Sequence, residues 1–411
     1  MASAESGSTH EVFNQSTPFV DFNLFTSDTI LQSFVAQEGG DPSSNRLTEL
    51  GAVAGSAKAA ELARQANENP PTLKPIDRYG NRQDMVEFHP AYHDLMSISM
   101  QHGLHCTSWE RNGSKAPADQ FRNVERAAGL FMTTQMEAGH SCPITMTNAS
   151  VAVLRQQSDV ADDWLSKIFV HDYDNRFVPL DEKHSVTIGM GMTERQGGTD
   201  VRSNTTCAIP IEGGGPGREY LVNGHKWFMS APMCDAFLIL AQAPGGLSCF
   251  FVPRLLPDGS QNPLRFQRLK DKLGNRSNAS SEVEFHGVHA WLIGEEGRGD
   301  NTIIEILTYT RLDCATSSAG LMRQALANAI HHCNNRTVFQ RKLIDQPLMR
   351  QVLADMTLEQ EAATALVIRL ARAFDGAEED SREASIARIM SPAIKYWVCK
   401  ALPGFAYEAM E

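Results

Sequence analysis

The sequence predicts an α+β fold in which helical regions at both ends enclose a middle β region. Three observations indicate this order. Apolar residues recur at helical spacing before residue 186, short β-type runs separated by turn residues fill residues 186–292, and helical spacing returns after residue 293. Strands do not alternate with helices, and no G-x-G-x-x-G joins a strand to a helix, so a Rossmann fold is disfavoured. We therefore expect three domains, at residues 1–185, 186–292 and 293–411.

The N-terminal region contains four segments with helical patterns. They cover residues 46–67, 89–110, 117–138 and 147–169, and the second is interrupted near Gly103. Residues 69–83 (NPPTLKPIDRYGNRQ) are rich in Pro, Gly and Asn, which predicts a loop. Residues 1–45 are polar with scattered aromatic side chains, and the first helical pattern follows them.

The middle region contains short runs typical of strands, among them TTCAIPI, EYLVNGHKWFMS, AFLILAQ, LSCFFVPR and SEVEFHGV. Asn223-Gly224 is a hairpin-turn dipeptide, so we expect it to separate two strands. Short antiparallel strands at this spacing predict a small barrel or sandwich. The C-terminal region then predicts long helices over residues 301–336, 347–374 and 383–401, with GAEEDS as a polar break.

The charge balance disfavours several function classes, although it leaves room for a local basic patch. The 411 residues carry a formal net charge of −12 at pH 7, and no Lys/Arg run exceeds three residues. Proteins that bind a polyanion along a broad surface normally carry a basic face, so a chain-wide nucleic-acid or membrane-surface role is disfavoured. No apolar run is long enough to span a membrane, and no secretory, transit or C-terminal peroxisomal signal occurs. We expect a cytoplasmic protein.

The cysteines predict free thiols. None of the eight forms a C-x-x-C pair, and no His pair has the spacing of zinc ligands. His331, His332 and Cys333 are adjacent, but neighbours on a helix point in different directions. We therefore expect no metal site.

The segment GMTERQGGTDVRS, residues 191–203, is the most informative for function. Its adjacent glycines, Gly197 and Gly198, let the backbone turn tightly and approach a flat ligand closely. Nearby hydroxyls and free backbone N–H groups can bond the carbonyls and nitrogens of a ring system. On composition alone, the same residues also fit an ordinary turn that enters a β domain.

This segment resembles the flavin signature of the acyl-CoA dehydrogenase family at every defined position. The resemblance implies the family's three-domain fold, with a helical domain, a middle β domain and a C-terminal helical bundle, and FAD as cofactor. In the family this loop cradles the isoalloxazine, and the matched cofactor-binding residues here are Met192, Thr193, Glu194, Gly197, Gly198, Thr199, Asp200 and Val201. Ser203 would approach the substrate, an acyl-CoA thioester.

Further landmarks of the family follow in order. Trp227, Phe228 and Met229 resemble the Trp-Ile-Thr strand that packs on the flavin, although Met229 replaces the threonine and Trp227 alone also fits a core position. Lys272 to Ser277 resembles the Lys-x-Gly-x-Arg-x-Ser segment. In the family, the residues that match Arg336, Phe339 and Gln346 reach the FAD of a neighbouring subunit, which implies a homo-oligomer. An alternative is that Arg336 is only a surface residue of a helix.

The details resemble the AidB-type branch of the family. They include VFNQ near the start, FHP, ITMT, GHKWF-S and RLKDKLGNRSNAS, and the resemblance covers about residues 10–411. AidB-type proteins are flavoproteins linked in bacteria to protection of DNA from alkylation. Relative to the family we expect the chain to be C-terminally shortened, without the domain through which this branch is thought to bind DNA.

The catalytic base of the family is not found. Most members place a glutamate in an aromatic-Glu-Gly-Thr/Ser motif, which is absent here, and a minority place it at the position of Thr310. Glu305 lies nearby on the same predicted helix. Three hypotheses follow: an FAD-dependent oxidoreductase that dehydrogenates an unidentified acyl-CoA, an AidB-type DNA-protecting flavoprotein, and a flavin-binding paralogue without turnover.

Overall fold

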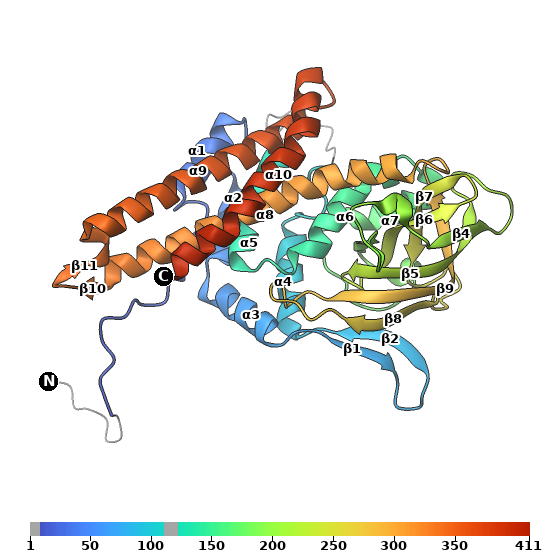
Figure 1. Ribbon diagram of the computed structural model, residues 1–411, viewed down its shortest axis with the longest axis horizontal. Helices are drawn as coiled ribbons and strands as arrows, with labels where there is room; N and C mark the ends of the chain where they lie inside the picture. The colour runs from blue at the N-terminus through green and yellow to red at the C-terminus, as the bar shows by residue number, and fades with distance from the viewer. Residues whose placement is uncertain (1–8, 111–121) are drawn as a thin grey trace.

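The computed structural model describes residues 9–110 and 122–411. Figure 1 shows an elongated molecule with a β domain at one end and long helices at the other, joined along its length by α8 (Gly299–Asn335). The sheet of the β domain and the helical layers beside it confirm the α+β class. No helix within the described ranges is both long and apolar enough to cross a membrane.

The N-terminal part contains seven α-helices and one β-hairpin within the described residues. The elements are α1 (Thr29–Gln37), α2 (Asn45–Ala54), α3 (Ala57–Glu68), β1 (Thr72–Ile76), β2 (Arg82–Glu87), α4 (Pro90–Gln101), α5 (Arg122–Met136), α6 (Ser141–Leu154) and α7 (Ser158–Ile168). The patterns at 46–67 and 147–169 each correspond to two helices rather than one. The first break lies at Gly55, where a Cβ would stand 1.8 Å from the carbonyl oxygen of Phe22. The expected helix start at 117 falls outside the described residues.

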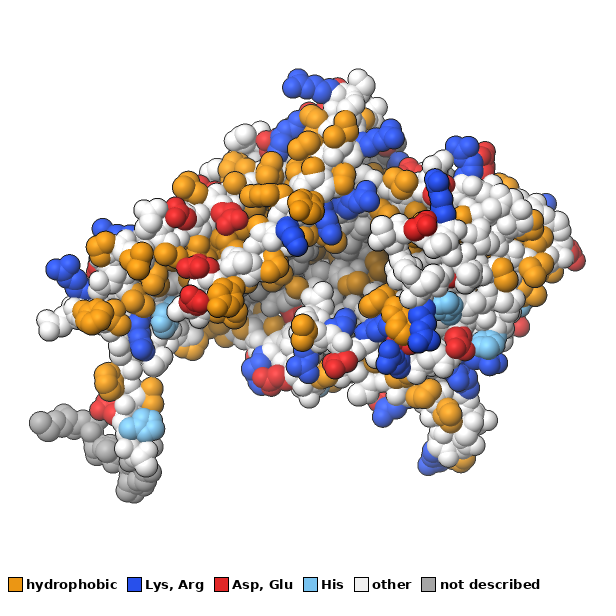
Figure 2. Space-filling model, in the orientation of Figure 1, with side chains coloured by type: hydrophobic (Ala, Val, Ile, Leu, Met, Phe, Trp, Pro, Cys, Tyr) orange, Lys and Arg blue, Asp and Glu red, His pale blue; other side chains and the backbone are white. Residues whose placement is uncertain are grey.

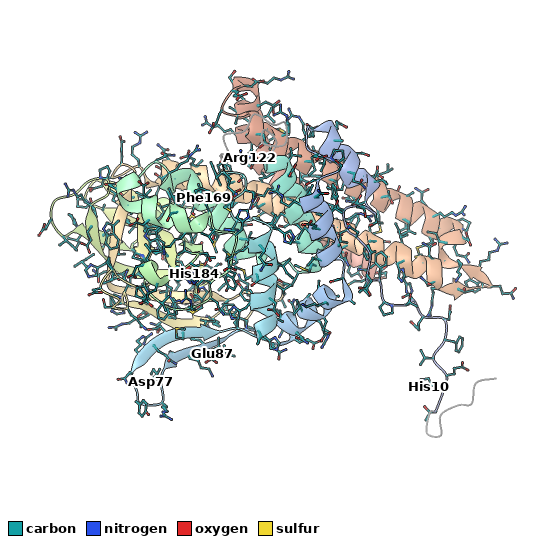
Figure 3. The ribbon with its side chains drawn as sticks, turned by 180° about the vertical axis from the view of Figure 1, so that it is seen from behind. His10, Asp77, Glu87, Arg122, Phe169 and His184 are labelled. Carbon is teal, nitrogen blue, oxygen red and sulfur yellow. The ribbon has the colours of Figure 1, made fainter. Side chains whose placement is uncertain are left out.

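The prediction of a loop at residues 69–83 is wrong. The segment enters an antiparallel hairpin, in which Leu73 pairs with Val86. The Gly- and Asn-rich part forms only the turn, where Asp77 Oδ1 accepts hydrogen bonds from the backbone N–H groups of Tyr79 and Asn81, both at 2.8 Å. Figure 3 shows Asp77 at the projecting tip and Glu87 at the base, where the hairpin meets the rest of the molecule.

The middle part is one seven-stranded sheet. Its strands are β3 (Ile188–Gly191), β4 (Cys207–Pro210), β5 (Glu219–Ser230), β6 (Ala236–Ala243), β7 (Gly246–Pro253), β8 (Leu264–Leu269) and β9 (Ser280–Ile293). The order is β3-β5-β4-β6-β7-β9-β8, and further pairings of β3 with β6 and of β5 with β9 curl the sheet into a barrel-like shape. The expectation of purely antiparallel strands is corrected, because β6 runs parallel to β3 and meets β4 in a parallel bridge.

The expected hairpin turn at Asn223-Gly224 is also wrong. β5 continues through this dipeptide and pairs with β9 on both sides of it. The register shifts between Val222 and Asn223, which marks a β-bulge, and Gly224 has φ +146°. A Cβ on Gly224 would lie 2.6 Å from Thr206, so the glycine permits a close approach of two strands.

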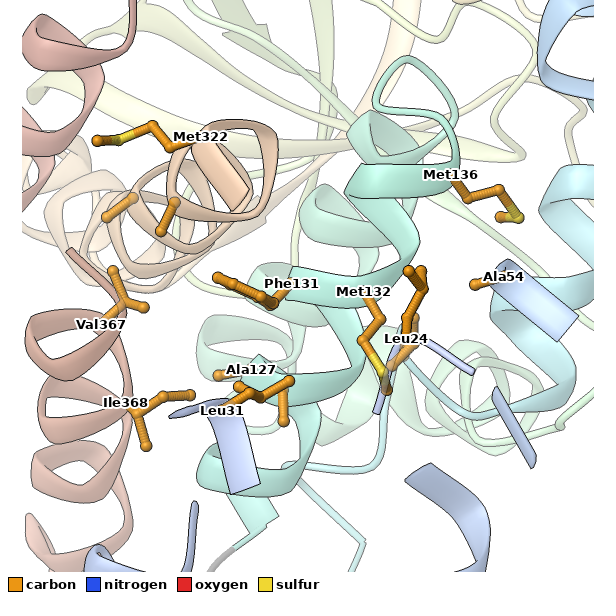
Figure 4. Close-up of a cluster of buried hydrophobic side chains, with 14 of the residues drawn as sticks. Leu24, Leu31, Ala54, Ala127, Phe131, Met132, Met136, Met322, Val367 and Ile368 are labelled. Carbon is orange, nitrogen blue, oxygen red and sulfur yellow. The ribbon is translucent and has the colours of Figure 1, made fainter. Parts of the chain in front are cut away.

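The C-terminal part confirms the three predicted long helices. They are α8, α9 (Pro347–Gly376) and α10 (Ser381–Met410), and a small hairpin of β10 (Thr337–Val338) and β11 (Arg341–Lys342) joins the first two. Figure 4 shows Phe131 of α5 facing Val367 of α9, with Met322 of α8 nearby, all buried. All eight cysteines are free, as expected.

Candidate functional site

The flavin-signature loop leaves β3 and folds back on itself at once. The backbone N–H groups of Glu194 and Gly197 each donate to the other's carbonyl, at 3.2 and 3.0 Å. At Gly198 a Cβ would stand 2.4 Å from Thr193 Oγ1, whereas one on Gly197 would meet open space. The loop is therefore packed tightly on its inner side and open on its outer side.

Glu194 anchors this loop from inside. Its side chain is fully buried, and its carboxylate accepts hydrogen bonds from the backbone N–H groups of Thr205 (2.7 Å) and Thr206 (3.1 Å). Lys226 Nζ lies 2.9 Å from Oε1 and is fully buried too. Burial raises the pKa of Glu194, but these donors outweigh burial and hold the pKa well below its ordinary value. Glu194 thus offers no side-chain surface to a cofactor and acts through the position of the loop.

The outer side of the loop presents the remaining signature residues. Thr199, Asp200 and Ser203 are exposed, and Met192 and Thr193 are half-buried. Within the described part of the chain, the backbone N–H groups of Gly198 and Thr199 donate no hydrogen bond. An open loop with free donors fits the carbonyls and nitrogens of an isoalloxazine.

β5 forms the wall beside the loop. The backbone N–H of Trp227 donates to Thr193 O at 2.8 Å, which joins the two elements. Lys270 Nζ lies 3.5 Å from the centre of the Trp227 ring, and the guanidinium groups of Arg195 and Arg268 lie 5.2 and 5.6 Å from it. These distances suit cation–π contacts. Trp227 is half-buried and lies beside basic side chains, so it is not simply a core residue.

The next two residues of β5 point in opposite directions. The Phe228 side chain is exposed, and the Met229 side chain is fully buried in the barrel core. A side chain without exposed surface cannot contact a ligand, whereas Lys270 Nζ lies over both the Trp227 and the Phe228 rings, 3.5 and 4.5 Å from their centres. Only Phe228 of this pair offers surface to a cofactor.

Figure 2 shows a hollow between the C-terminal helices and the β domain, with Lys and Arg side chains along its rim. A basic rim suits a ligand that carries phosphate, because guanidinium and ammonium groups bind phosphate oxygens.

Arg336, Phe339 and Gln346 lie far from the loop in the same chain. Arg202, next to Ser203, is bonded at 2.9 Å to Asp300 in the first turn of α8, whereas Arg336 caps the other end of this 37-residue helix. A helix of that length spans about 55 Å. Figure 1 shows the β10–β11 hairpin and the β domain at opposite ends of the molecule. One chain therefore cannot bring the two groups of residues to one flavin.

The β10–β11 hairpin has a strained tip. Phe339 and Gln340 have φ values of +49° and +66°, which is uncommon for side chains other than glycine. Phe339 is 93% exposed, so its ring has no packing partner that would offset this strain. Behind the tip, Gln346 Nε2 donates to Val338 O at 3.3 Å.

An N-terminal arm holds the base of this hairpin. Asn14 Nδ2 donates to Thr337 O and Asn14 Oδ1 accepts from Thr337 N, both at 2.8 Å. Arg336 Nη1 donates to Asn14 O at 3.1 Å. The amide of Asn14 thus pairs with the backbone as a neighbouring strand would. In the sequence, Asn14 stood out only as part of the VFNQ motif. No spacing along the chain indicated that it would contact Thr337.

The position at which a minority of the family carries its base is occupied by Thr310. Its hydroxyl donates to Leu307 O at 3.1 Å, as an ordinary helix residue does. The carboxylate of Glu305 accepts from Gln156 Nε2 at 3.1 and 3.2 Å. Neither residue is placed as a free base over the loop, and we assign no catalytic base.

A group of possible metal ligands lies elsewhere, in the N-terminal part. Donor atoms of Cys106, Glu110 and His171 lie within 4.8 Å of one another. Glu110 Oε1 and His171 Nε2 are hydrogen-bonded at 2.5 Å, so the carboxylate–imidazole pair accounts for the proximity. His331, one of the three adjacent residues His331, His332 and Cys333 of the sequence, bonds Thr17 O at 2.8 Å.

Three family models match successive parts of the chain. The N-terminal domain of the adaptive response protein AidB matches residues 14–175, the middle domain of acyl-CoA dehydrogenases matches 189–288, and their C-terminal domain matches 297–411. The order of these matches follows the three structural parts.

Two relatives and two solved structures show the same relationship. The putative acyl-CoA dehydrogenase AidB of Escherichia coli K12 is 48% identical over 404 residues, which cover 98% of this chain and 73% of the relative. Acyl-CoA dehydrogenase family member 11 of Caenorhabditis elegans is 28% identical, over 86% of this chain and 58% of the relative. The structure titled Bd2924 apo-form has TM-score 0.87 and 26% identity, over 97% of this chain and 80% of that one. The structure of C. elegans ACDH-11 in complex with C11-CoA has TM-score 0.86 and 26% identity, over 100% of this chain and 69% of that one.

The chain thus belongs to the acyl-CoA dehydrogenase family, in its AidB-type branch. As a member of this flavoprotein family its cofactor is FAD, and the open loop with its free donors fits that group. The chain spans 73% and 58% of the lengths of the two curated relatives.

Proposed function

We propose that this protein is an FAD-dependent oxidoreductase that removes hydrogen from the α and β carbons of an acyl-CoA thioester. The observation that carries the proposal is the signature loop, held open by the buried Glu194–Lys226 pair and joined to the Trp227 strand. In such a reaction FAD supplies the acceptor for the hydride that leaves the β carbon.

The residues of the chain have separable tasks in this proposal. Thr193, Gly198 and Thr199 bind the flavin ring through hydroxyls and backbone N–H groups, and Trp227 covers the ring from β5. Ser203, exposed at the end of the loop, contacts the acyl-CoA. Its Oγ donates to Asp200 O at 2.7 Å, which leaves the oxygen free to accept a hydrogen bond.

The cofactor site is completed by a second copy of the chain. Arg336 provides a cation for the FAD pyrophosphate, Phe339 packs on the cofactor, and Gln346 bonds the adenine. The strained, exposed Phe339 supports this assignment, because an exposed aromatic side chain held at positive φ gains its packing only from a partner. We therefore propose a homo-oligomer.

An anaerobic titration of the FAD-loaded protein with a panel of acyl-CoA thioesters tests the proposal. Bleaching of the flavin absorbance by one of them is the expected result. Flavin that binds but is bleached by none would favour the paralogue without turnover. Protein that takes up no flavin on reconstitution would contradict the proposal as a whole.

The similarity to E. coli AidB over 98% of this chain favours one second candidate, a flavoprotein that protects DNA from alkylation. The net charge of −12 opposes broad contact with DNA. A gel shift of duplex DNA that weakens with added salt would support this candidate. No shift even at low salt would count against it.

A further inference from the structure

A cavity outside the flavin loop lies between the first and middle domains. Its volume is about 260 Å³. One side is formed by β2, α4 and the residues between them, with Met85, Phe88 and Met96. The other is formed by the segments that directly follow β5 and β7, with Met233 and Arg254. Tyr173 and Phe177, from the stretch that follows α7, close it.

Arg254 is the unusual group in this cavity. It is 7% exposed, and its guanidinium donates only to two thioether sulfurs, Met233 Sδ at 3.4 Å and Met85 Sδ at 3.8 Å. It also stacks on Phe177, 4.0 Å from the ring centre. No carboxylate of the described residues lies within 4.0 Å of it. Buried charges in proteins are normally paired, because an unpaired one is strongly unfavourable.

The other charges of the cavity have partners. Lys183 Nζ is 2.9 Å from Asp235 Oδ1 and 3.8 Å from Asp174 Oδ1. Asp235 Oδ2 also accepts from Thr187 N at 2.8 Å, and Asp174 is bonded to Arg176 at 2.7 Å. Arg254 has no carboxylate of the described residues within 4.0 Å; burial lowers its pKa, and the charges of Asp235 and Asp84 act only from a longer distance to raise it.

The remaining walls select the ligand. Met96, Phe88 and Phe177 are apolar, and thioether sulfurs are weak acceptors, so they do not satisfy a guanidinium. Tyr173 Oη is bonded to His93 Nδ1 at 3.1 Å, and burial lowers the pKa of His93, so the imidazole adds no further positive charge near neutral pH. The cavity thus places one guanidinium that touches no carboxylate against apolar side chains on one side, while the paired charges of Lys183, Asp235 and Asp174 line another part of the wall.

We propose that this cavity binds a small monocarboxylate with an apolar body, whose carboxylate pairs with the Arg254 guanidinium in a two-bond fork. The geometry of guanidinium and carboxylate matches in this way. An apolar cavity of roughly 150 Å³ holds benzene, so 260 Å³ accommodates a ring with one carboxylate. The site bridges two domains and is separate from the flavin loop, and it stands whether or not the protein dehydrogenates acyl-CoA.

Calorimetric titration of the FAD-loaded full chain with benzoate tests this. Benzyl alcohol, of similar shape but uncharged, and inorganic phosphate, an anion without an apolar body, are the comparison probes. Benzoate is expected to bind with Kd of about 1 mM or tighter, at least about tenfold tighter than either comparison probe. Arg254→Gln should weaken benzoate about tenfold or more and leave benzyl alcohol unchanged. Arg218→Gln, an exposed change in the same domain, should have no effect.

Three results would overturn the proposal. They are equal binding of benzoate and benzyl alcohol, unchanged benzoate binding by folded Arg254→Gln protein, and displacement of benzoate by acyl-CoA with a matching change in the flavin spectrum. If Arg254→Gln fails to fold, the comparison of the three probes on the unaltered chain still tests whether the cavity selects a carboxylate with an apolar body. Phe177→Leu then reports the location, because removal of the stacked ring should weaken benzoate at least about threefold, and unchanged binding would place benzoate elsewhere.

Discussion

Lys226 Nζ lies 2.9 Å from Glu194 Oε1, and both side chains are fully buried between the signature loop and β5. The second carboxylate oxygen accepts from the backbone of Thr205, so one carboxylate ties together the start of the loop, its exit and the adjacent strand. The shape of the open outer side depends on this contact. Lys226 was not among the residues that the signature indicated, although it stands directly before Trp227.

Replacement of Lys226 by Met should therefore damage both stability and flavin binding. It leaves the Glu194 carboxylate buried without its cation, which destabilises a fold by about 3–5 kcal/mol. The double variant Lys226→Met with Glu194→Gln should recover part of this loss, because Gln is neutral and still accepts from the backbone. Urea unfolding and FAD titration measure the two effects. Lys58→Met, an exposed change on α3, is the control, and a Lys226→Met protein as stable as this control would contradict the structural role.

Gly198 should tolerate no side chain. An alanine Cβ would stand 2.4 Å from Thr193 Oγ1 and 3.0 Å from its Cγ2, so the loop must shift. We expect Gly198→Ala to weaken FAD binding about tenfold or more, with little change in circular dichroism. Gly274→Ala, where the new Cβ meets nothing within 4 Å, is the matched control. Equal FAD affinity of the two variants would show that the loop does not hold the flavin.

Phe339→Gly should separate stability from cofactor binding. The change removes the strain of a side chain at φ +49°, so the free energy of unfolding should stay level or rise by up to ~1 kcal/mol. FAD affinity should fall at the same time if the ring packs on the cofactor of a second chain. Gln340→Gly relieves similar strain at φ +66° and keeps the ring, so its FAD affinity should match that of the unaltered chain. Unchanged affinity in Phe339→Gly would remove the residue from the site.

The sequence predicted the elements that depend on local patterns and missed those that depend on contacts between distant segments. The three C-terminal helices were predicted to within a few residues, except the end of α10, because long periodic patterns are local. Asn223-Gly224 predicted a turn, but pairing of β5 with β9 on both sides overrode the preference of the dipeptide. The hairpin at 72–87 was missed because Pro75, which favours a loop, lies inside β1, where the register of the strand pair shifts between Lys74 and Ile76.

In the candidate site, too, the sequence predicted the residues that are contiguous and missed the contacts between distant segments. The signature located Thr193 to Ser203, since the pattern is contiguous. It did not show that Glu194 faces Lys226, because that contact joins residues 32 positions apart. Nor did it show that Arg254 is buried without a carboxylate, which depends on Met85 and Phe177 from the first domain. Such facts follow from packing between distant segments, and composition or spacing does not encode them.

Asn14 should act as a positioning residue for the β10–β11 hairpin. Asn14→Ala removes both bonds to the Thr337 backbone and should weaken FAD binding about three- to tenfold, while the free energy of unfolding changes by about 1 kcal/mol. Asn14→Asp keeps the acceptor but loses the donor, so its FAD affinity should be no better. Gln15→Ala, exposed beside it, is the control. A loss of stability in Asn14→Ala without loss of FAD affinity would mean that the arm only stabilises the fold.

Glu137 should make the domain junction acid-sensitive. Its buried carboxylate accepts from His140 Nδ1 (2.9 Å), from the backbone of Gly139 and His140, and from Ser277 Oγ of the β domain (2.8 Å). Burial raises its pKa, but these partners lower it to about 2, from 4.5. A carboxyl with a lowered pKa contributes to the stability of the fold above pH 4.5. This contribution, about 3 kcal/mol in the free energy of unfolding, is lost as the pH falls toward 2. Urea unfolding should be measured from pH 6 to pH 3. The free energy of unfolding should fall less over this range in Glu137→Gln than in the exposed control Glu212→Gln, although Glu137→Gln starts from a lower value at pH 6. Parallel pH profiles of the two variants would assign the acid sensitivity to other groups.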